Sequence, residues 1–396
     1  MKKTVLIIAL VGFFNFASAQ WLSTGGPGIA SVSPMVGIGT DLYIGSALKA
    51  IYVLRDGVLP WTSCGFTNAV NVLATDGTTL YAGIAQGTTP IDGIYKSTDN
   101  GATWTPTGLS GEAVFSILVK GTYIFAGTNT NGVFRSADNG ATWTAINNGI
   151  ALNVQALAIS GTTLFAGTNG GSGAYISTDN GDTWIGKNSG LPTTKNVRSL
   201  AVMGTTVIAG TWSGAFITSN NGETWTASNS GLSRLRIQSM AVDGSTLYAA
   251  TTDAGIFKTD LSANNITWST ANTDLTSLAI NSLTILGVNL YATVVEGSVV
   301  NVWKMALPSV ATGINNTRST TQLSVSPTFA NDKLTIEISG RTGKQEFNIM
   351  NIAGQTVYKS SITEKVTVDV ANFKSGIYMV KLDDGKSTVT KKFIKQ

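Results

Sequence analysis

Short runs of alternating hydrophobic and polar residues, separated by turns rich in glycine, follow one another through most of the chain. In one unit these runs cover 197–202, 205–210 and 214–217, and a fourth run opens with Thr224 and Trp225. Alternation over four to eight residues is typical of half-buried β-strands. The unit therefore predicts four short antiparallel strands, and its lack of a 3.6-residue period excludes helical and leucine-rich repeats.

The same unit recurs about every 41 residues. A fixed period of this length indicates a propeller or a solenoid, and four antiparallel strands per repeat are typical of a propeller blade. A hydrophobic pair in the second strand recurs seven times, at 42–43, 80–81, 124–125, 164–165, 207–208, 247–248 and 290–291. Seven tryptophans recur at the same spacing: Trp21, Trp61, Trp104, Trp143, Trp184, Trp225 and Trp268. We therefore predict an all-β chain with a seven-bladed β-propeller over residues 20–305.

The two ends of this propeller are expected to meet. At the repeat spacing, the next tryptophan after Trp268 would fall near residue 309, where none occurs. Trp21, in contrast, precedes the first complete set of strands. The segment 20–23 should therefore supply the last strand of the blade formed by residues 280–305. Closure of this kind removes the exposed sheet edges of the first and last blades.

The turn before the fourth strand carries the pattern Ser-x-Asp-x-Gly-x-Thr-Trp at 97–104, 136–143 and, with the same spacing, 177–184. The Asp carboxylate can accept backbone N–H groups inside the turn, Gly suits a positive φ, and Trp can pack into the blade. These segments resemble the Asp-box (BNR-type) repeat of sialidases, two-propeller xyloglucanases, sortilin-type receptors and photosystem assembly factors. The resemblance implies an outer-rim turn away from any site of chemistry. We assign a structural role to Asp99, Gly101, Trp104, Asp138, Gly140, Trp143, Asp179, Gly181 and Trp184.

The N-terminus predicts export. Lys2 and Lys3 precede an apolar run over 5–16, and Ala17-Ser18-Ala19 then forms a small-x-small cleavage site. This order is typical of a signal peptide over residues 1–19. No later segment approaches the roughly 18 uninterrupted apolar residues that a spanning helix needs. We therefore expect no transmembrane segment in the mature chain.

A second domain is expected at the C-terminus. Residues 306–322 are rich in Pro, Ser, Thr and Asn and predict a linker, whereas alternation over 333–338, 346–352 and 377–382 predicts a small β-sandwich over 323–396. The segments 326–336, 347–355, 375–378 and 391–396 resemble the type A C-terminal sorting domain of the type IX secretion system of Bacteroidetes. The resemblance implies the type IX secretion machinery as a partner and a secreted or outer-membrane cell-surface location. An independent adhesive sandwich is the alternative.

Composition narrows the chemistry of the chain. It has no histidine and one cysteine, Cys64, which excludes Ser-His-Asp and Cys-His catalysis, His-ligated metals and intramolecular disulfides. We expect no cofactor and no metal. The net charge of +4 lies at the ends, because residues 316–396 hold 12 Lys and Arg against 7 Asp and Glu. With Lys2 and Lys3 also removed, 20–315 keeps 26 − 12 − 2 = 12 basic and 22 − 7 = 15 acidic residues, so we expect no nucleic-acid partner.

The candidate ligand site lies on the face of the propeller formed by the loops that enter the first strands and those that join second to third strands. Trp212 does not fit the spacing of the periodic tryptophans, so no repeated core role explains it. Packing of its side chain over a blade end remains an alternative. We predict a ligand-binding site made of Trp212, Arg198, Arg234, Arg236 and Asp253, with a glycan or a surface protein as ligand.

Two function classes remain open from the sequence. The first is a non-catalytic binding module, which we favour, and the second is a glycoside hydrolase, because some Asp-box propellers are hydrolases. The arginine triad of sialidases has no counterpart here. A hydrolase would need two carboxyl groups about 5 to 9.5 Å apart. The candidates for such a pair are Asp92, Glu112, Asp253, Asp274 and Glu296.

Overall fold

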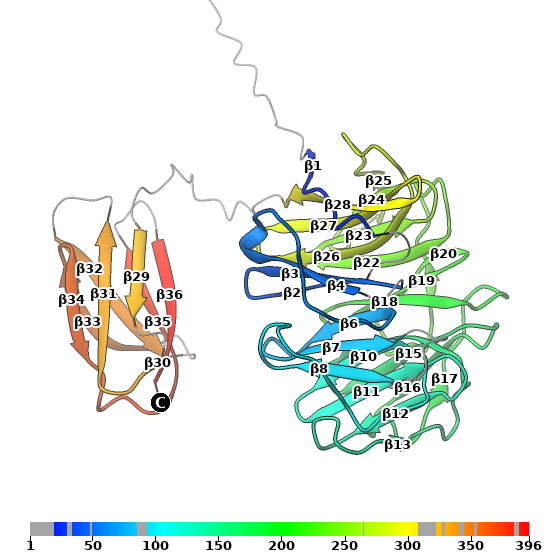
Figure 1. The fold of residues 1–396 in the computed structure, drawn as a ribbon, viewed down its shortest axis with the longest axis horizontal. Coiled ribbons are helices and arrows are strands. Elements are labelled where there is room, and N and C mark those ends of the chain that lie inside the picture. Colours follow the sequence, from blue (N-terminus) through cyan, green and yellow to red (C-terminus); the bar gives the residue numbers. More distant parts are fainter. Residues whose placement is uncertain are drawn as a thin grey trace, which may run out of the picture. The chain divides into compact units, whose positions relative to one another are not determined.

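A computed structural model describes residues 20–29, 34–47, 50–84, 93–263, 265–307, 322–326, 329–339, 344–351, 355–383 and 388–395. The predicted signal peptide 1–19, most of the predicted linker 306–322, and Asp92 lie outside the described residues. The chain divides into two compact units, Met1–Pro308 and Ser309–Gln396 (Figure 1).

The described part of the first unit contains seven four-stranded sheets, each antiparallel throughout. All but one contain four strands consecutive in sequence, and β1 joins the last sheet, beside β28. A single turn of 3-10 helix, η1 (Arg55–Gly57), follows β4. The sheets are β2 (Met35–Ile38), β3 (Asp41–Ser46), β4 (Ala50–Leu54), β5 (Thr62–Ser63); β6 (Val70–Thr75), β7 (Leu80–Ile84), β8 (Ile94–Ser97), β9 (Thr105–Pro106); β10 (Val114–Lys120), β11 (Tyr123–Thr128), β12 (Val133–Ser136), β13 (Thr144–Ala145); β14 (Val154–Ser160), β15 (Thr163–Thr168), β16 (Ala174–Ser177), β17 (Ile185–Gly186); β18 (Val197–Met203), β19 (Thr206–Thr211), β20 (Gly214–Thr218), β21 (Thr226–Ala227); β22 (Ile237–Asp243), β23 (Thr246–Thr251), β24 (Ile256–Asp260), β25 (Ser269–Thr270); and β26 (Ile280–Leu286), β27 (Asn289–Glu296), β28 (Val299–Ala306), β1 (Trp21–Ser23).

The sheets follow one another around a closed ring. The first strands of neighbouring sheets, which we call the inner strands, contact one another in the order β2, β6, β10, β14, β18, β22, β26, and β26 contacts β2 again. In Figure 1 the N-terminal β1 lies beside β28, and the register joins Trp21 to Met305. The expected pairing of segment 20–23 with the sheet of residues 280–305 is confirmed, as is the all-β fold of four-stranded sheets.

Close approach between an inner strand and the second strand of the preceding sheet depends on small residues in that second strand. Val197, which opens β18, is fully buried against Gly167 of β15. A Cβ added at Gly167 would lie 2.5 Å from Cγ1 of Val197 and 2.9 Å from its carbonyl oxygen. Real Cβ atoms do not approach other atoms this closely, so a larger side chain at this position would push the two sheets apart.

The periodic tryptophans pack between sheets. Trp184, Trp225, Trp268 and Trp21 are each at most 3% exposed. Their indole Nε1 groups donate to backbone carbonyls of the preceding sheet, at 3.0 Å to Ile146, 2.9 Å to Lys187, 2.7 Å to Ser228 and 2.7 Å to Ala271. Each therefore buries a large apolar surface and still satisfies its polar atom. Trp104 and Trp143 are only partly buried, and Trp143 Nε1 donates within its own turn to Gly140.

In four of the sheets a second periodic residue, which the sequence did not predict, ties the fourth strand to its own sheet. The side-chain oxygen of Asn188 accepts from the Ala174 N–H at 2.8 Å, and its Nδ2 donates to the Ser172 carbonyl at 3.2 Å. The same pair of bonds recurs one sheet earlier at Asn147 and in the next two sheets at Asn229 and Asn272. These asparagines satisfy backbone groups where the chain leaves the sheet.

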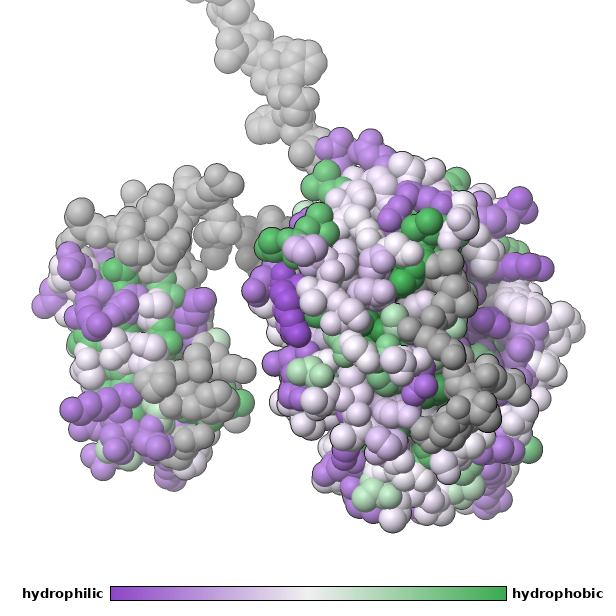
Figure 2. Space-filling view, in the orientation of Figure 1, coloured by the Kyte–Doolittle hydropathy of each residue, from purple (hydrophilic) through white to green (hydrophobic). Residues whose placement is uncertain are grey.

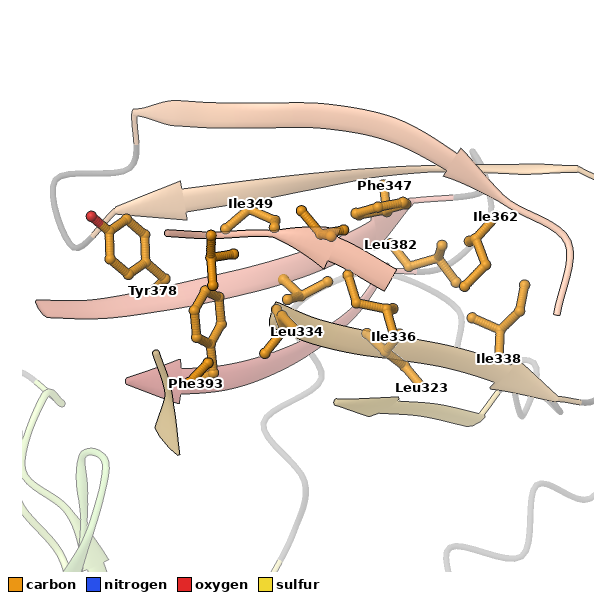
Figure 3. Close-up of a cluster of buried hydrophobic side chains, with 14 residues drawn as sticks. Leu323, Leu334, Ile336, Ile338, Phe347, Ile349, Ile362, Tyr378, Leu382 and Phe393 are labelled. Carbon is orange, nitrogen blue, oxygen red and sulfur yellow. The ribbon is translucent and has the colours of Figure 1, made fainter. Parts of the chain in front are cut away.

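The second unit consists of two sheets around one core. The sheet orders are β29-β31-β34 and β30-β36-β35-β32-β33. Figure 3 shows the buried side chains gathered between them, with Leu334 and Ile336 on one sheet and Phe347, Leu382 and Phe393 on the other. The strands are β29 (Gln322–Ser326), β30 (Phe329–Ala330), β31 (Lys333–Ser339), β32 (Gln345–Asn351), β33 (Thr356–Ile362), β34 (Lys365–Asp369), β35 (Gly376–Asp383) and β36 (Thr388–Lys395).

The surface seen in Figure 2 is mostly polar, and its hydrophobic residues form small separate patches. Scattered apolar residues of this kind are normal on a folded protein. Large exposed apolar side chains on the first unit include Leu152, Trp212, Leu235 and Leu278.

Candidate functional site

The three aspartates of the Asp-box turns are fixed within their own turns. Asp138 Oδ1 accepts from Ser136 Oγ at 2.7 Å and from the Thr142 N–H at 2.9 Å, and Oδ2 accepts from Thr142 Oγ1 at 2.6 Å. These bonds, led by the one from the Thr142 hydroxyl, lower the pKa of Asp138 to about 2. Asp99 and Asp179 make the same bonds, and their pKa values are also lowered to about 2. Such carboxylates stay ionised at neutral pH and do not suit a general acid.

The backbone of the turn explains its sequence. In each of these turns two successive residues have positive φ, for example Asn139 at 56° and Gly140 at 87°. Asparagine tolerates this region better than most residues, and glycine adopts it freely. The sequence predicted a positive φ at the glycine alone. In the fourth turn Asn220 replaces Asp, and its Nδ2 donates to Thr224 Oγ1 at 2.9 Å.

Several basic residues of the first unit join neighbouring sheets. Arg135 donates to the Asn180 carbonyl at 2.8 Å and pairs with Asp182 at 2.7 Å. Lys96 donates to the Asn139 carbonyl, and Lys187 pairs with Glu223 at 2.6 Å. Each contact runs from one sheet to the turn of the next. These cations therefore have a structural role and are not free for a ligand.

Four of the predicted site residues meet at one end of two adjacent sheets. Trp212 lies in the turn between β19 and β20, and its ring is 5.5 Å from the Arg236 guanidinium carbon. Arg234 Nε lies 3.4 Å from the Asp253 carboxylate, and both side chains are more than half exposed. Together with Ser233 and Leu235, three of the four line an open groove of about 450 Å³. We call Trp212, Arg234, Arg236 and Asp253 the arginine groove.

The arginine groove offers cations and an aromatic ring to solvent. Trp212 is 44% exposed, and a cation beside an indole face is attracted by about 0.5–1 kcal/mol at an exposed site. The Arg234–Asp253 pair is also exposed and contributes about 0–1 kcal/mol to stability. These weak contacts orient the side chains at little cost when a ligand replaces them.

Arg198 does not line the arginine groove. It is the second residue of β18, and the register of β18 with β19 skips it, passing from Val197 to Ser199. Its side chain is half-buried, and burial lowers the pKa of its guanidinium. No described residue forms a salt bridge with it. The predicted site therefore separates into a groove and an isolated cation on the inner strand.

Three of the carboxylates proposed for a hydrolase make local contacts: Glu112, Glu296 and, through Arg234, Asp253. Glu112 accepts from Asn131 Nδ2 at 2.8 Å. Glu296 accepts from Thr276 and from Asn301 Nδ2, and the Thr276 bond is the main cause of its lowered pKa. Asp274 has a φ of 70° in a loop where other sheets have glycine. The lowered pKa of Glu296 does not suit a general acid, which needs a raised one.

Two further features bear on the chemistry of the first unit. Burial raises the pKa of Cys64 to about 11, which keeps its thiol protonated and unreactive. The outer edges of two sheets form a groove of about 680 Å³ between β21 and residues 265–267, lined mostly by Ser, Thr and Asn residues together with Ile217, Ala227 and Ile266. Over the described parts of the chain, no group of three His, Cys, Asp or Glu side chains could hold a metal ion.

Comparison with known proteins assigns the second unit. Residues 324–396 match the family described as "Secretion system C-terminal sorting domain". These residues are a secretion sorting domain. The match confirms the type IX sorting domain expected from the sequence and the secreted or cell-surface location, and it implies an interaction with the secretion machinery. No helix in the described residues is both long and apolar enough to cross a membrane.

Solved structures show the fold of the first unit. YCF48 from Cyanidioschyzon merolae is 13% identical, with a TM-score of 0.56, covering 73% of this chain and 99% of that one. A structure of YCF48 bound to D1 peptide is 13% identical, with a TM-score of 0.55 and coverages of 75% and 97%. The extracellular domain of a putative one component system from B. thetaiotaomicron is 10% identical, with a TM-score of 0.56, covering 96% of this chain and 59% of that one. These neighbours confirm a β-propeller. A search of curated proteins finds no match.

Proposed function

We propose that the first unit is a seven-bladed propeller that acts as a non-catalytic binding module at the cell surface, and that its ligand is an anionic glycan. The observation that carries this proposal is the arginine groove, where two arginines and an exposed tryptophan meet beside one exposed carboxylate. An indole ring can stack on a sugar ring, and guanidinium groups can bind carboxylates in a bidentate way.

The proposed export route rests on the sequences at the two ends of the chain. The proposed route is removal of a signal peptide at residues 1–19 and passage through the type IX secretion system of a member of the Bacteroidetes. The sorting domain would then be removed by a cut in the linker 306–322. The match of residues 324–396 to a sorting domain supports this route.

A protein or peptide ligand is the second candidate. One solved structure with this fold is YCF48 bound to a D1 peptide, which supports peptide binding by that protein. For this chain a fold likeness at 13% identity favours no particular ligand. A glycoside hydrolase remains the alternative to a binding module.

The test is a glycan array probed with the full chain, its Trp212→Ala variant and a Val288→Ala control at two salt concentrations. Val288 is 74% exposed in the turn between β26 and β27, so the control also removes an exposed apolar side chain. We expect anionic glycans to be preferred and salt to weaken binding. Loss of a stacked ring should cost about 1–3 kcal/mol, or roughly fivefold to 150-fold in affinity. Equal binding by all three proteins would contradict the proposal, and turnover of an arrayed sugar would favour the hydrolase.

A further inference from the structure

Six inner strands carry a β-bulge at the same position. In each, the register with the second strand skips the second residue of the inner strand, whereas β2 pairs without a skip. The skipped residues are Asn71, Phe115, Gln155, Arg198, Gln238 and Asn281. Bulges re-aim side chains and are frequent beside functional sites. We call these six residues the bulge ring.

The residues of the bulge ring stand out from their buried neighbours. Each follows a valine or isoleucine that is at most 1% exposed, as Arg198 follows Val197, but is itself partly exposed. Because the inner strands contact one another around a closed ring, we expect residues at equivalent positions of these strands to lie at the same end of the ring. The bulge ring therefore takes one residue from the start of the inner strand in each of six sheets.

Five of the six residues of the bulge ring are polar, and their side chains have few partners. Gln155 Nε2 donates to Asn153 Oδ1 at 2.7 Å. Among the described residues, none forms a side-chain hydrogen bond or salt bridge with Asn71, Arg198, Gln238 or Asn281. A half-buried guanidinium without an anion has lost hydration that no protein group replaces. That imbalance favours an anionic ligand at Arg198.

We propose that the bulge ring binds the carboxylate of a single hexuronic acid residue, with Arg198 as the cation that recognises it. One guanidinium matches one carboxylate through two parallel hydrogen bonds. Side-chain amides both donate and accept, as sugar hydroxyls require, and Gln155 and Gln238 occupy this position in the two sheets that flank that of Arg198. Phe115 adds an apolar ring. The inference rests on the proposed function, because it names the sugar chemistry for the same unit.

The experiment is ligand-observed NMR titration of the full chain with glucuronate and galacturonate, and with glucose and galactose as neutral counterparts. At least one acid should bind about tenfold or more tightly than its neutral counterpart, the ratio expected for charge-assisted hydrogen bonds. Arg198→Gln should abolish that preference. Lys195→Gln removes the same charge three residues earlier and should change the affinity by no more than about twofold.

Stability supplies a second readout for the same variant. Arg198→Gln without sugar should melt at the same or a higher temperature, because it removes a desolvated charge that no described residue pairs. A markedly lower melting temperature would mean that Arg198 holds the fold, and would overturn the proposal. Equal binding of acids and neutral sugars, no detectable binding of either acid, or equal effects of Arg198→Gln and Lys195→Gln would also overturn it.

The two proposals can fail separately. Trp212→Ala should leave binding of the free hexuronic acids unchanged, because Trp212 belongs to the arginine groove and not to the bulge ring. Array ligands that need Trp212, together with no hexuronate binding, would support the binding module and refute the bulge ring. Hexuronate binding that needs Arg198, with no array ligand that needs Trp212, would give the reverse result.

Discussion

Replacing Gly190 with alanine should destabilise the first unit strongly, because this glycine lies where one sheet meets the tryptophan of the next. Gly190 has a φ of +87°, and an added Cβ would lie 1.9 Å from the Trp225 carbonyl oxygen. The loop would have to move away from Trp225. That movement strains the bonds from the Trp225 N–H to the Ser189 carbonyl, at 2.8 Å, and from Trp225 Nε1 to the Lys187 carbonyl, at 2.9 Å.

The expected loss follows from two contributions. A non-glycine residue in the left-handed region costs about 1–2 kcal/mol. The two strained hydrogen bonds add about 0.5–1.5 kcal/mol each. Gly190→Ala should therefore lower the free energy of unfolding by roughly 2–5 kcal/mol. Gly204→Ala is the matched control, since Gly204 has a φ of +59° with nothing within 4 Å of its added Cβ. The control should show the first contribution alone.

Urea unfolding of the full chain, followed by tryptophan fluorescence, measures both variants. The nine tryptophans all lie between residues 21 and 303, so the signal reports on the first unit. The midpoint should fall further for Gly190→Ala than for Gly204→Ala at an unchanged slope. Equal midpoints would refute the steric argument. The closing sheet already shows the expected relaxation: Asp274 stands near Trp21 with a φ of 70°, and the Trp21 N–H lies 3.4 Å from the Thr273 carbonyl.

Three further predictions concern closure, acid and processing. Deleting residues 20–23 removes the buried Trp21 and should lower the free energy of unfolding by about 3–5 kcal/mol or more. Unchanged unfolding in urea would mean that the ring closes without this strand. Asp138→Asn should lower the melting temperature at pH 7. The folded pKa of about 2 lies below the ordinary 3.8, so the stability from ionised Asp138 is lost as pH falls from about 4 to 2. The difference in melting temperature between variant and wild type should therefore vanish over this range. A difference that stays constant with pH would contradict this assignment. Mass spectrometry of the exported protein should find Gln20 as its first residue and a C-terminus within 306–322, and an intact Gln396 would exclude this processing.

The sequence predicted the repeat because the same physical demand recurs in each sheet. A large side chain must fill the space beside the preceding sheet, and Trp184, Trp225 and Trp268 meet that demand at regular intervals. The same logic could have found Asn147, Asn188, Asn229 and Asn272, which are spaced by 41, 41 and 43 residues. They were missed because asparagine is common in the loops of this chain.

The candidate site was harder to read from the sequence. The composition, and the departure of Trp212 from the regular tryptophan spacing, indicated Trp212 and the basic residues near it as candidates. A β-bulge, however, is a relation between two strands, so nothing in the residues 197–199 alone reveals that Arg198 is skipped. The division between the arginine groove and Arg198 likewise depends on register. Side-chain identity gave the candidates, and pairing between strands decides which of them act together.

The sheet shared by β1 and β28 has a consequence for the order of folding. Thr24 and Val302 are joined by a side-chain hydrogen bond across 278 residues, whereas most sheets form within one repeat. Closing a loop of that length costs about 2 kcal/mol more than closing one repeat, and the contact cannot form until the last strand is available. Long-range pairings of this kind slow folding. If the chain crosses a membrane with its N-terminus first, Trp21 would therefore stay unpaired until nearly the whole first unit had crossed. The ring would close only on the far side of that membrane.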